Sequence, residues 1–316
     1  MLNRRHLRIK VLQALYAFFQ DEEAEMGKAE RHLMFSVTKF HELYIYLLAI
    51  LQRLHLLRVE KMEMARKRRV PTDEDLNPNL RFVENPFLVE LSANKALNKA
   101  VETYKIQWDE DRLAIVKDAY QKMLGLPEYQ GYMSGEGEMN DQQIVTKVLK
   151  ECIANNELVQ HHLDEMSIFW VDDLDLASSM AIKTIKAWKK VEEEGNGEVL
   201  GLYKDEKEEK DFVEKLFRNT ILESAEHEEL IGEKTKNWDL DRIAYMDMLL
   251  MKMALTEART FKSIPTKVTM NEYLELSKYY STPKSNAFIN GVLDKLFAEM
   301  KEDGRIKKIG RGLLET

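Results

Sequence analysis

The stretch that decides the expected fold lies near the end of the chain. Residues 264–268 read Ile-Pro-Thr-Lys-Val, residues 271–272 read Asn-Glu, and residues 288–295 read Phe-Ile-Asn-Gly-Val-Leu-Asp-Lys. Apolar side chains in the last segment and just after it recur every three or four residues, which is typical of a helix with one buried face. The whole stretch therefore predicts a helical hairpin with a turn near residues 281–285.

The composition of the rest of the chain also favours helices. The 316 residues are 44% hydrophobic and contain only 13 Gly and 6 Pro. Long Gly- and Pro-free stretches are rich in Leu, Met, Glu, Lys and Ala, which are strong helix formers. No alternating apolar and polar run of strand length stands out. We therefore expect an all-α fold with enough apolar residues for a sizeable core.

Periodicity and breakers place the expected helices along the chain. A long helix over about 28–69 has apolar residues alternating by three and four, as in a coiled-coil seam. The segment 192–210 reads as a charged linker. Within the hairpin, Thr269 and Glu272 have capping-box spacing, although the helix could begin at Thr266 instead. The expected helices cover about 4–20, 28–69, 92–107, 109–124, 141–163, 172–193, 211–233, 239–260 (with Asp239 as its N-cap), 268–281 and 286–301.

Charge and cysteine content exclude several classes of protein. The net charge of −8 argues against a non-specific nucleic-acid coat, but the first twenty residues contain Arg4, Arg5, Arg8 and Lys10 without any acid. The single cysteine, Cys152, cannot form an internal disulfide, so a reducing, cytoplasmic compartment is expected. We find no stretch of roughly 20 apolar residues that would span a bilayer.

The sequence contains none of the common catalytic or cofactor-binding signatures. Glycine-rich nucleotide loops, the metalloprotease His-Glu-x-x-His and the hydrolase Gly-x-Ser-x-Gly are all missing. His41 and His55 fall on an apolar helix and read as structural histidines, and Cys152 reads as a packing residue. We therefore expect no catalytic residue, no metal site and no cofactor.

The basic first helix is a candidate phosphate-binding surface. Arg5 and Arg8 are three residues apart, so both guanidinium groups could reach one phosphate backbone. Tyr16, about two turns further on, offers a ring on which a base could stack. The alternative is a solvated cationic face with Tyr16 at the edge of the core.

The turn before the last helix is a second candidate. Backbone N–H groups at a helix N-terminus bind phosphates readily, and Lys284, Ser285 and Asn286 lie at this one. The alternative is an ordinary proline turn in which Ser285 caps the helix. Gly291 inside the last helix suggests close approach of a neighbouring helix. The run of basic residues at 66–69 could bind phosphates or simply complement a helix C-terminus.

Taken together, these motifs resemble the NusB transcription antitermination family. The resemblance covers about the first 20 residues and about 211–301. It implies an all-helical bundle of two subdomains, enlarged here by a helical insertion, with divisions at 1–57, 58–205 and 206–316. The residues that carry it are Arg4-Arg5-x-x-Arg8, Gln13-Ala14-Leu15-Tyr16, Ile264-Pro265-x-Lys267-Val268, Asn271-Glu272, Lys278 and Phe288-x-Asn290-Gly291-Val292-Leu293-Asp294-Lys295.

The resemblance also implies a function without catalysis. Members of this family bind the boxA element of ribosomal RNA transcripts together with NusE, a ribosomal protein, in the RNA polymerase antitermination complex. No small-molecule substrate and no membrane are implied. Carried over to this chain, the RNA-binding residues would be Arg4, Arg5, Arg8, Tyr16, Asp247, Lys284, Ser285, Asn286 and Phe288.

This sequence departs from the family pattern in several places. The chain is about twice the usual length, His6 replaces one of a run of arginines, and Lys284 and Ala287 differ from common residue types in the loop. Two alternatives therefore stay open: a protein-only helical adaptor that has no RNA binding of its own, and an RNA-modifying enzyme, since related domains occur fused to RNA methyltransferases.

Overall fold

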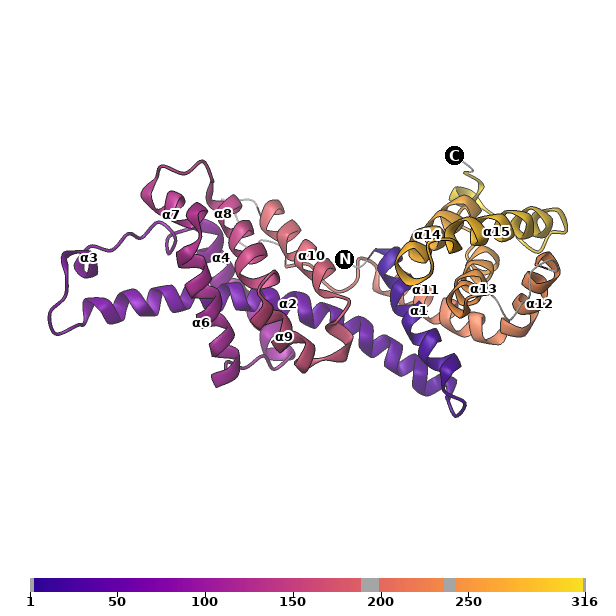
Figure 1. Cartoon of the computed structure of the whole chain (residues 1–316), viewed down its shortest axis with the longest axis horizontal. Coiled ribbons are helices and arrows are strands. Elements are labelled where there is room, and N and C mark those ends of the chain that lie inside the picture. Colours follow the sequence, from indigo (N-terminus) through magenta and orange to yellow (C-terminus); the bar gives the residue numbers. More distant parts are fainter. Residues whose placement is uncertain (1–2, 189–198, 236–242, 315–316) are drawn as a thin grey trace. The chain divides into compact units, whose positions relative to one another are not determined.

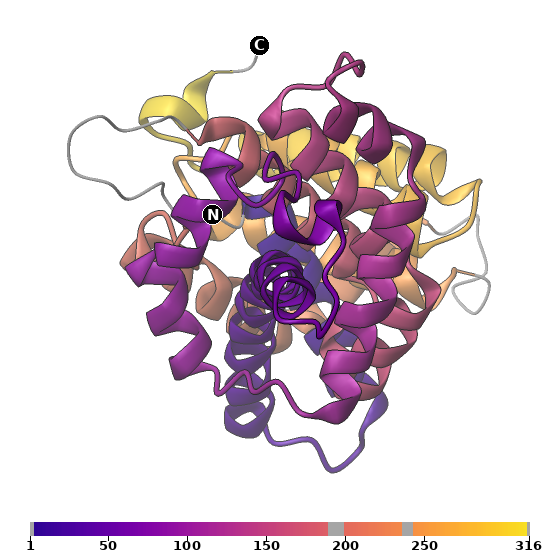
Figure 2. The ribbon, with the colours of Figure 1, turned by 90° about the vertical axis from the view of Figure 1, so that its left-hand side faces the viewer.

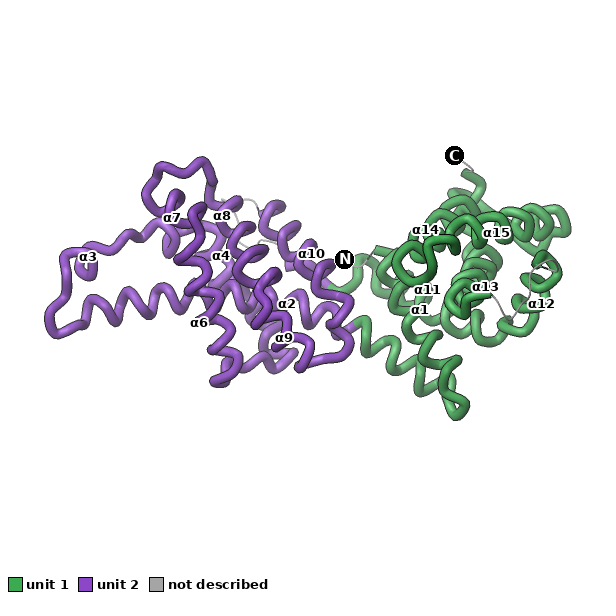
Figure 3. The backbone as a smooth tube through the Cα atoms, in the orientation of Figure 1, with its two compact units in different colours: residues 1–37, 202–316 green, residues 38–201 purple. Residues whose placement is uncertain are grey.

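The computed structural model describes residues 3–188, 199–235 and 243–314, and these residues form helices and connecting segments with no strand (Figure 1). The all-α prediction is therefore confirmed. The chain divides into two compact units, coloured separately in Figure 3. Unit 1 combines Met1–Val37 with Leu202–Thr316, and unit 2 is Thr38–Gly201. The long helix α2 (Met26–Arg66) contributes to both.

Unit 1 is built around one central helix, α13 (Tyr245–Thr260). Every residue from position 249 to position 258 is buried, so this helix has no solvent-facing side over its middle turns. Its polar side chains must therefore find partners inside the protein. The helices that pack against α13 are α1 (Arg4–Gln20), α11 (Glu206–Leu222), α12 (Ser224–Lys234), α14 (Thr266–Tyr280) and α15 (Ser285–Glu302).

Helix α1 begins where the sequence predicted and packs on α11 and α13. The side chain of Asn3 caps it by accepting a hydrogen bond from the His6 backbone N–H at 3.1 Å. Leu7, Val11 and Leu15 are fully buried and form the apolar stripe that the periodicity predicted. Burial of this stripe fixes which way the arginines of the same helix point.

The helical hairpin of α14 and α15 is present, but its capping differs from the prediction. Helix α14 begins at Thr266, which was the alternative start, and Pro265 is its N-cap. The capping box of Thr269 and Glu272 is wrong, because both side chains bind partners elsewhere in unit 1. The cap predicted for Ser285 is also wrong, since α15 has Lys284 at its N-cap and no side-chain cap.

The packing role expected of Gly291 is wrong as well. A Cβ atom built at this position meets nothing within 4 Å, and the residue is exposed. No close contact in unit 1 therefore requires a glycine at this position.

Unit 2 surrounds the long helix α2. In Figure 2, which looks along this helix, other helices of unit 2 lie beside it. They are α3 (Asp73–Leu76), α4 (Pro86–Ala93), α5 (Lys95–Thr103), α6 (Glu110–Gly125), α7 (Pro127–Ser134), α8 (Asp141–Val148), the π-helical turn η1 (Leu149–Ala154), α9 (Glu157–Met166), the 3-10 turn η2 (Ile168–Trp170) and α10 (Leu174–Ala187).

The middle of α2 is buried on all sides, not along one coiled-coil seam as predicted. Every residue from position 43 to position 51 is buried. This explains why an 18-residue window of α2 is apolar enough to cross a membrane, contrary to the sequence prediction, although 67% of that window is buried inside the protein. A core helix passes the same composition test as a membrane span.

Two histidines of α2 are hydrogen-bonded within unit 2. The His41 ring contacts the Tyr104 hydroxyl at 2.6 Å and the Leu200 carbonyl oxygen at 2.9 Å. The His55 ring contacts the Ser92 hydroxyl at 3.0 Å and the Val83 carbonyl oxygen at 2.8 Å. The structural role predicted for His41 and His55 is thereby confirmed.

Several boundaries differ from the sequence prediction. The helix expected over 141–163 is interrupted by η1, and the one expected over 211–233 is split at Glu223. The units divide the chain at 37/38 and 201/202, whereas the sequence predicted divisions at 57/58 and 205/206. The N-cap predicted at Asp239 lies outside the described residues.

Candidate nucleic-acid interface

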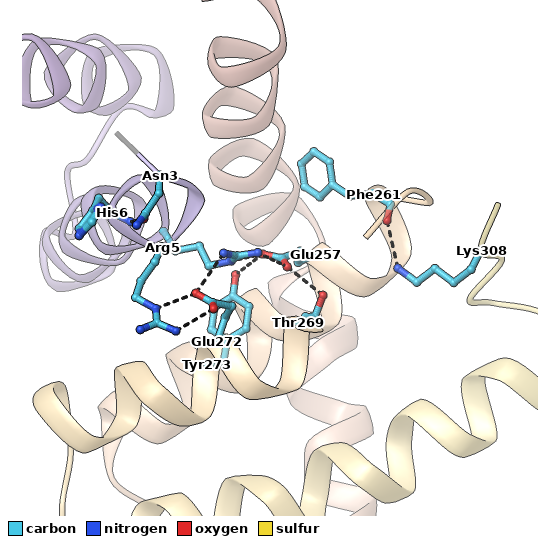
Figure 4. Close-up of polar contacts among 10 residues, drawn as sticks. Asn3, Arg5, His6, Glu257, Phe261, Thr269, Glu272, Tyr273 and Lys308 are labelled. Carbon is cyan, nitrogen blue, oxygen red and sulfur yellow. Dashed lines mark hydrogen bonds and ion pairs between the residues drawn. The ribbon is translucent and has the colours of Figure 1, made fainter. Parts of the chain in front are cut away.

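The third arginine of α1 is buried and ion-paired. Arg8 is 2% exposed, and its Nε and Nη2 atoms donate hydrogen bonds to the Glu257 carboxylate at 2.6 and 2.7 Å. Glu257 is 0% exposed and also accepts from Thr269 Oγ1 at 2.8 Å and from the Tyr273 hydroxyl at 3.1 Å (Figure 4). The carboxylate thus receives four hydrogen bonds, which compensate its loss of water.

The protonation states follow from this arrangement. Burial alone would lower the pKa of Arg8, but the hydrogen bonds and the charge of Glu257 outweigh burial and raise the pKa above its ordinary value. Burial and the neighbouring carboxylate raise the pKa of Tyr273 well above its usual range. Arg8 is therefore charged and Tyr273 is a neutral donor at physiological pH.

Arg5 binds a second carboxylate, at the surface of unit 1. Its Nε and Nη2 atoms donate to the two Glu272 oxygens at 2.9 and 2.8 Å (Figure 4), and Arg8 Nη1 approaches the same carboxylate at 3.4 Å. The hydrogen bond from Arg5 lowers the pKa of Glu272. Arg5 and Arg8 therefore both reach one carboxylate, that of Glu272, and the predicted contact of both arginines with one phosphate backbone stays a prediction.

The side chains of Arg4 and Arg5 are more exposed than that of Arg8. Arg4 forms an ion pair with Glu208, and its side chain is 32% exposed; the Arg5 side chain is 43% exposed. Burial and the neighbouring Arg5 lower the pKa of His6 to about 4. His6 is thus neutral at pH 7 and adds no charge to this end of α1, as the sequence predicted.

At the other end of α1, two tyrosines form an exposed aromatic pair. The Tyr16 and Tyr245 rings are 5.6 Å apart at 83°, and the two residues are 44% and 43% exposed. Sequence reasoning missed Tyr245. Its signal was its place at the start of α13, ahead of the buried turns of that helix.

The turn before α15 is held together by its own hydroxyl groups. The Ser285 hydroxyl is 2.8 Å from that of Thr282 and 3.0 Å from that of Ser281, and Ser281 donates to the buried carboxylate of Asp247. Asp247 thereby fixes the turn to the first turn of α13. It is not the solvated acid that was the alternative interpretation.

The remaining predicted residues of the turn are divided between interior and surface. The Asn286 side chain donates to the Leu274 carbonyl oxygen at 2.9 Å, and Phe288 is half-buried. Lys284, with Thr282 and Pro283, is exposed. Ser285 and Asn286 therefore shape the turn, whereas Lys284 carries its accessible charge.

Two contacts between α1 and α13 show how the arginines and the tyrosine pair are arranged along α1. Arg8 meets Glu257 near the end of α13, and Tyr16 meets Tyr245 at its start, so the two helices run antiparallel. Arg8 and Tyr16 are about 12 Å apart along the helix axis, from the rise per residue. The arginines thus lie at one end of α1, and the tyrosine pair and the turn lie at the other.

Among the described residues, no group of three or more His, Cys, Asp or Glu side chains is placed to hold a metal ion. Cys152 is buried, and burial raises the pKa of its thiol to about 12, which makes it a poor nucleophile. What the arrangement offers is a helical surface with exposed guanidinium groups, an exposed aromatic pair and a lysine-bearing turn.

Comparisons with known proteins agree with this all-helical architecture. The model of the NusB family matches residues 176–298. The transcription antitermination protein NusB of Salinibacter ruber is 43% identical over 105 residues, which are 33% of this chain and 66% of that protein. The NusB protein of Chloroherpeton thalassium is 39% identical over 106 residues, 34% of this chain and 50% of that protein.

The NusB protein of Listeria monocytogenes is 35% identical over 96 residues, which are 30% of this chain and 75% of that protein. The chain belongs to the NusB family. The matched part spans about two thirds of the first relative and half of the second, and the family match leaves out residues 1–175. No solved structure matches this chain.

Proposed function

We propose that this protein is an RNA-binding transcription antitermination factor. Its RNA ligand is boxA-type RNA of ribosomal RNA transcripts, bound together with the ribosomal protein NusE in the RNA polymerase antitermination complex. Family membership supports the general role, since the related proteins are named transcription antitermination proteins. In this proposal the protein acts in the cytoplasm and catalyses no reaction.

The observation that carries the RNA-binding proposal is the exposed pair of Tyr16 and Tyr245. Exposed aromatic rings lose favourable burial, and stacked bases are the ligands that such rings bind in single-stranded RNA. The rings are linked to the turn before α15 through Asp247 and Ser281. Bases stacked on the tyrosines would thus lie near the charge of Lys284.

The arginines take different roles in this proposal. Arg4 and Arg5 contact phosphates, because their side chains are partly exposed and their carboxylate partners lie at the surface. Arg8 orients α1 from the interior, because its guanidinium is buried against Glu257. Ser285, Asn286 and Phe288 hold the turn in shape for the strand, and Asp247 anchors it.

Substitutions at one position separate stacking from burial. Tyr16→Phe keeps the ring and should bind boxA RNA like the unchanged protein, whereas Tyr16→Leu keeps apolar volume and should weaken binding about tenfold, since stacking contributes about 1–3 kcal/mol per base. Lys284→Gln should weaken binding, and Lys295→Gln, an exposed lysine further along α15, serves as its control.

The assay is fluorescence anisotropy with boxA RNA and a scrambled RNA, each measured with and without NusE at two salt concentrations. Equal affinity for the two RNAs under all conditions would refute the proposal. Equal binding by Tyr16→Leu and Tyr16→Phe would refute the stacking role assigned to Tyr16.

One observation favours a second candidate function, a protein-only adaptor. Each of Arg4, Arg5 and Arg8 already binds a carboxylate of its own chain, so the positive charge of α1 is largely neutralised. An adaptor would bind its protein partner equally well after ribonuclease treatment. A partner lost on ribonuclease treatment supports the RNA-binding function instead.

A further inference from the structure

A groove in unit 2 has a positively charged wall that the proposed RNA surface of unit 1 does not use. The groove has a volume of about 770 Å³ and lies among the last turns of α2, the segment around α3 and the end of α6. Arg58, Lys61, Ala65 and Arg68 line it from one side. Arg58, Lys61 and Ala65 are three and four residues apart, which puts them on one face of α2, and Arg68 follows just after the helix ends at Arg66.

Two of these cations are not neutralised. Arg68 forms an ion pair with Asp75 at 3.1 Å. Arg58 and Lys61, by contrast, pair with no acid in the parts of unit 2 that the structure describes. Glu74 also lines the groove, so two free cations face one free carboxylate. The wall therefore keeps a positive charge in a chain whose net charge is −8.

Both free cations meet at the same aromatic ring. Arg58 Nη1 donates to the Tyr120 hydroxyl at 3.2 Å, and Lys61 Nζ lies 5.5 Å from the centre of the Tyr120 ring. The Nε atom of Arg58 is buried and has no hydrogen-bond partner. The Tyr120 hydroxyl and ring hold both cations beside the groove by favourable contacts, and the unsatisfied N–H of Arg58 costs free energy.

The length of the charged row indicates what kind of anion fits. Residues 58 to 66 of α2 extend over about 12 Å at the rise of a helix, which is longer than one phosphate group, and Arg68 lies beyond the helix end. Arg66, Lys67 and Arg69 continue the charge at the exposed end of α2. Asn77 and Gln121 add amide groups that can bind ribose hydroxyls.

We propose that this groove binds the backbone of single-stranded RNA without sequence preference. Arg58 and Lys61 contact successive phosphates, and the basic run at 66–69 receives the strand beyond them. The inference goes beyond the proposed boxA function, since it assigns RNA contact to the part of the chain that the family match largely leaves out. It gives a role to the basic run that the sequence could not assign.

The test uses the full chain and a labelled oligouridine that contains no boxA sequence. Arg58→Gln with Lys61→Gln should weaken binding about fivefold, and the slope of log K against log salt should fall by about 1.4, the value for two phosphate contacts to a single strand. Lys61→Gln alone, at an exposed position, should lower the slope by about half as much.

The matched control is Lys95→Gln with Lys99→Gln, which removes two exposed charges from α5 in the same unit. This control should bind like the unchanged chain. Unchanged binding by both groove variants, or an equal loss in the control, would overturn the proposal. Binding of ATP or pyrophosphate that depends on Arg58 and Lys61, with unchanged oligouridine binding, would also overturn it in favour of a small phosphate ligand. Because the probe lacks boxA, this result is independent of boxA selectivity.

Discussion

Replacing Arg8 with methionine tests whether the buried ion pair holds α1 in place. Arg8→Met keeps much of the apolar stem but leaves the Glu257 carboxylate without its cation, in a position where both side chains are almost fully buried. Removing one partner of a buried pair costs about 3–5 kcal/mol. Domains are stable by only about 5–15 kcal/mol, so unit 1 would lose a large part of its stability.

The measurement is urea unfolding followed by circular dichroism, with thermal unfolding as a second readout. We expect Arg8→Met to lower the free energy of unfolding by about 4 kcal/mol and the melting temperature of unit 1 by roughly 10 °C. The matched control is Arg4→Met, which removes the same charge from a partly exposed pair with Glu208. Exposed pairs contribute about 0–1 kcal/mol.

A second substitution separates charge from packing. In Arg8→Met with Glu257→Gln neither of these two positions carries a charge, and the glutamine oxygen can still accept hydrogen bonds from Thr269 and Tyr273. This double variant should therefore be more stable than Arg8→Met alone. If Arg8→Met costs no more than Arg4→Met, the buried pair does not hold α1. If the double variant is no more stable than the single one, the cost comes from lost packing and the electrostatic reasoning is wrong.

Three further outcomes are expected. Glu272→Gln should release Arg5 and tighten RNA binding about threefold at low salt, measured by anisotropy; weaker binding would mean that Glu272 positions Arg5 instead. Lys308→Met removes the donor from two carbonyl oxygens at the end of α13 and should cost about 1 kcal/mol in urea unfolding, whereas Lys307→Met should not. Burial lowers the pKa of Lys308 to about 8, below its unfolded value of 10.5. The folded state therefore binds fewer protons than the unfolded state between these pH values, and the free energy of unfolding should rise from pH 8 to pH 10. Lys308→Met should abolish this increase.

The fold class could be predicted from the sequence because helical periodicity is a local property. The hairpin of α14 and α15 and the first helix lie close to their predicted positions. The all-round burial of α2 and α13 was harder to predict, because a run that is apolar on every side has no single stripe to read. The turns that divide the predicted helices at 141–163 and 211–233 likewise contain no proline or glycine at the break.

The roles of individual site residues depended on partners that are far away in the sequence. Arg8 shares its helical face with Leu12 and Leu15, a spacing that does indicate burial, but its partner Glu257 is 249 residues distant. The use of the Ser285 hydroxyl inside the turn likewise depends on Ser281, which Asp247 anchors from 34 residues away. Spacing shows which side chains share a face, and only tertiary packing decides which of them keep a free charge.

That distinction accounts for the difference in exposure between Arg8 and the two arginines before it in α1. Glu257 lies in a helix buried on every side, so it must be neutralised from within, and Arg8 is the cation that packing brings to it. Arg4 and Arg5 meet carboxylates at the surface, where water and salt make ion pairs weak. In the proposed RNA complex, phosphates would compete with the carboxylate partners of Arg4 and Arg5, and not with Glu257, which is fully buried. The same helix is thus fixed to its unit by one buried arginine, while its other two arginines form their ion pairs nearer the surface.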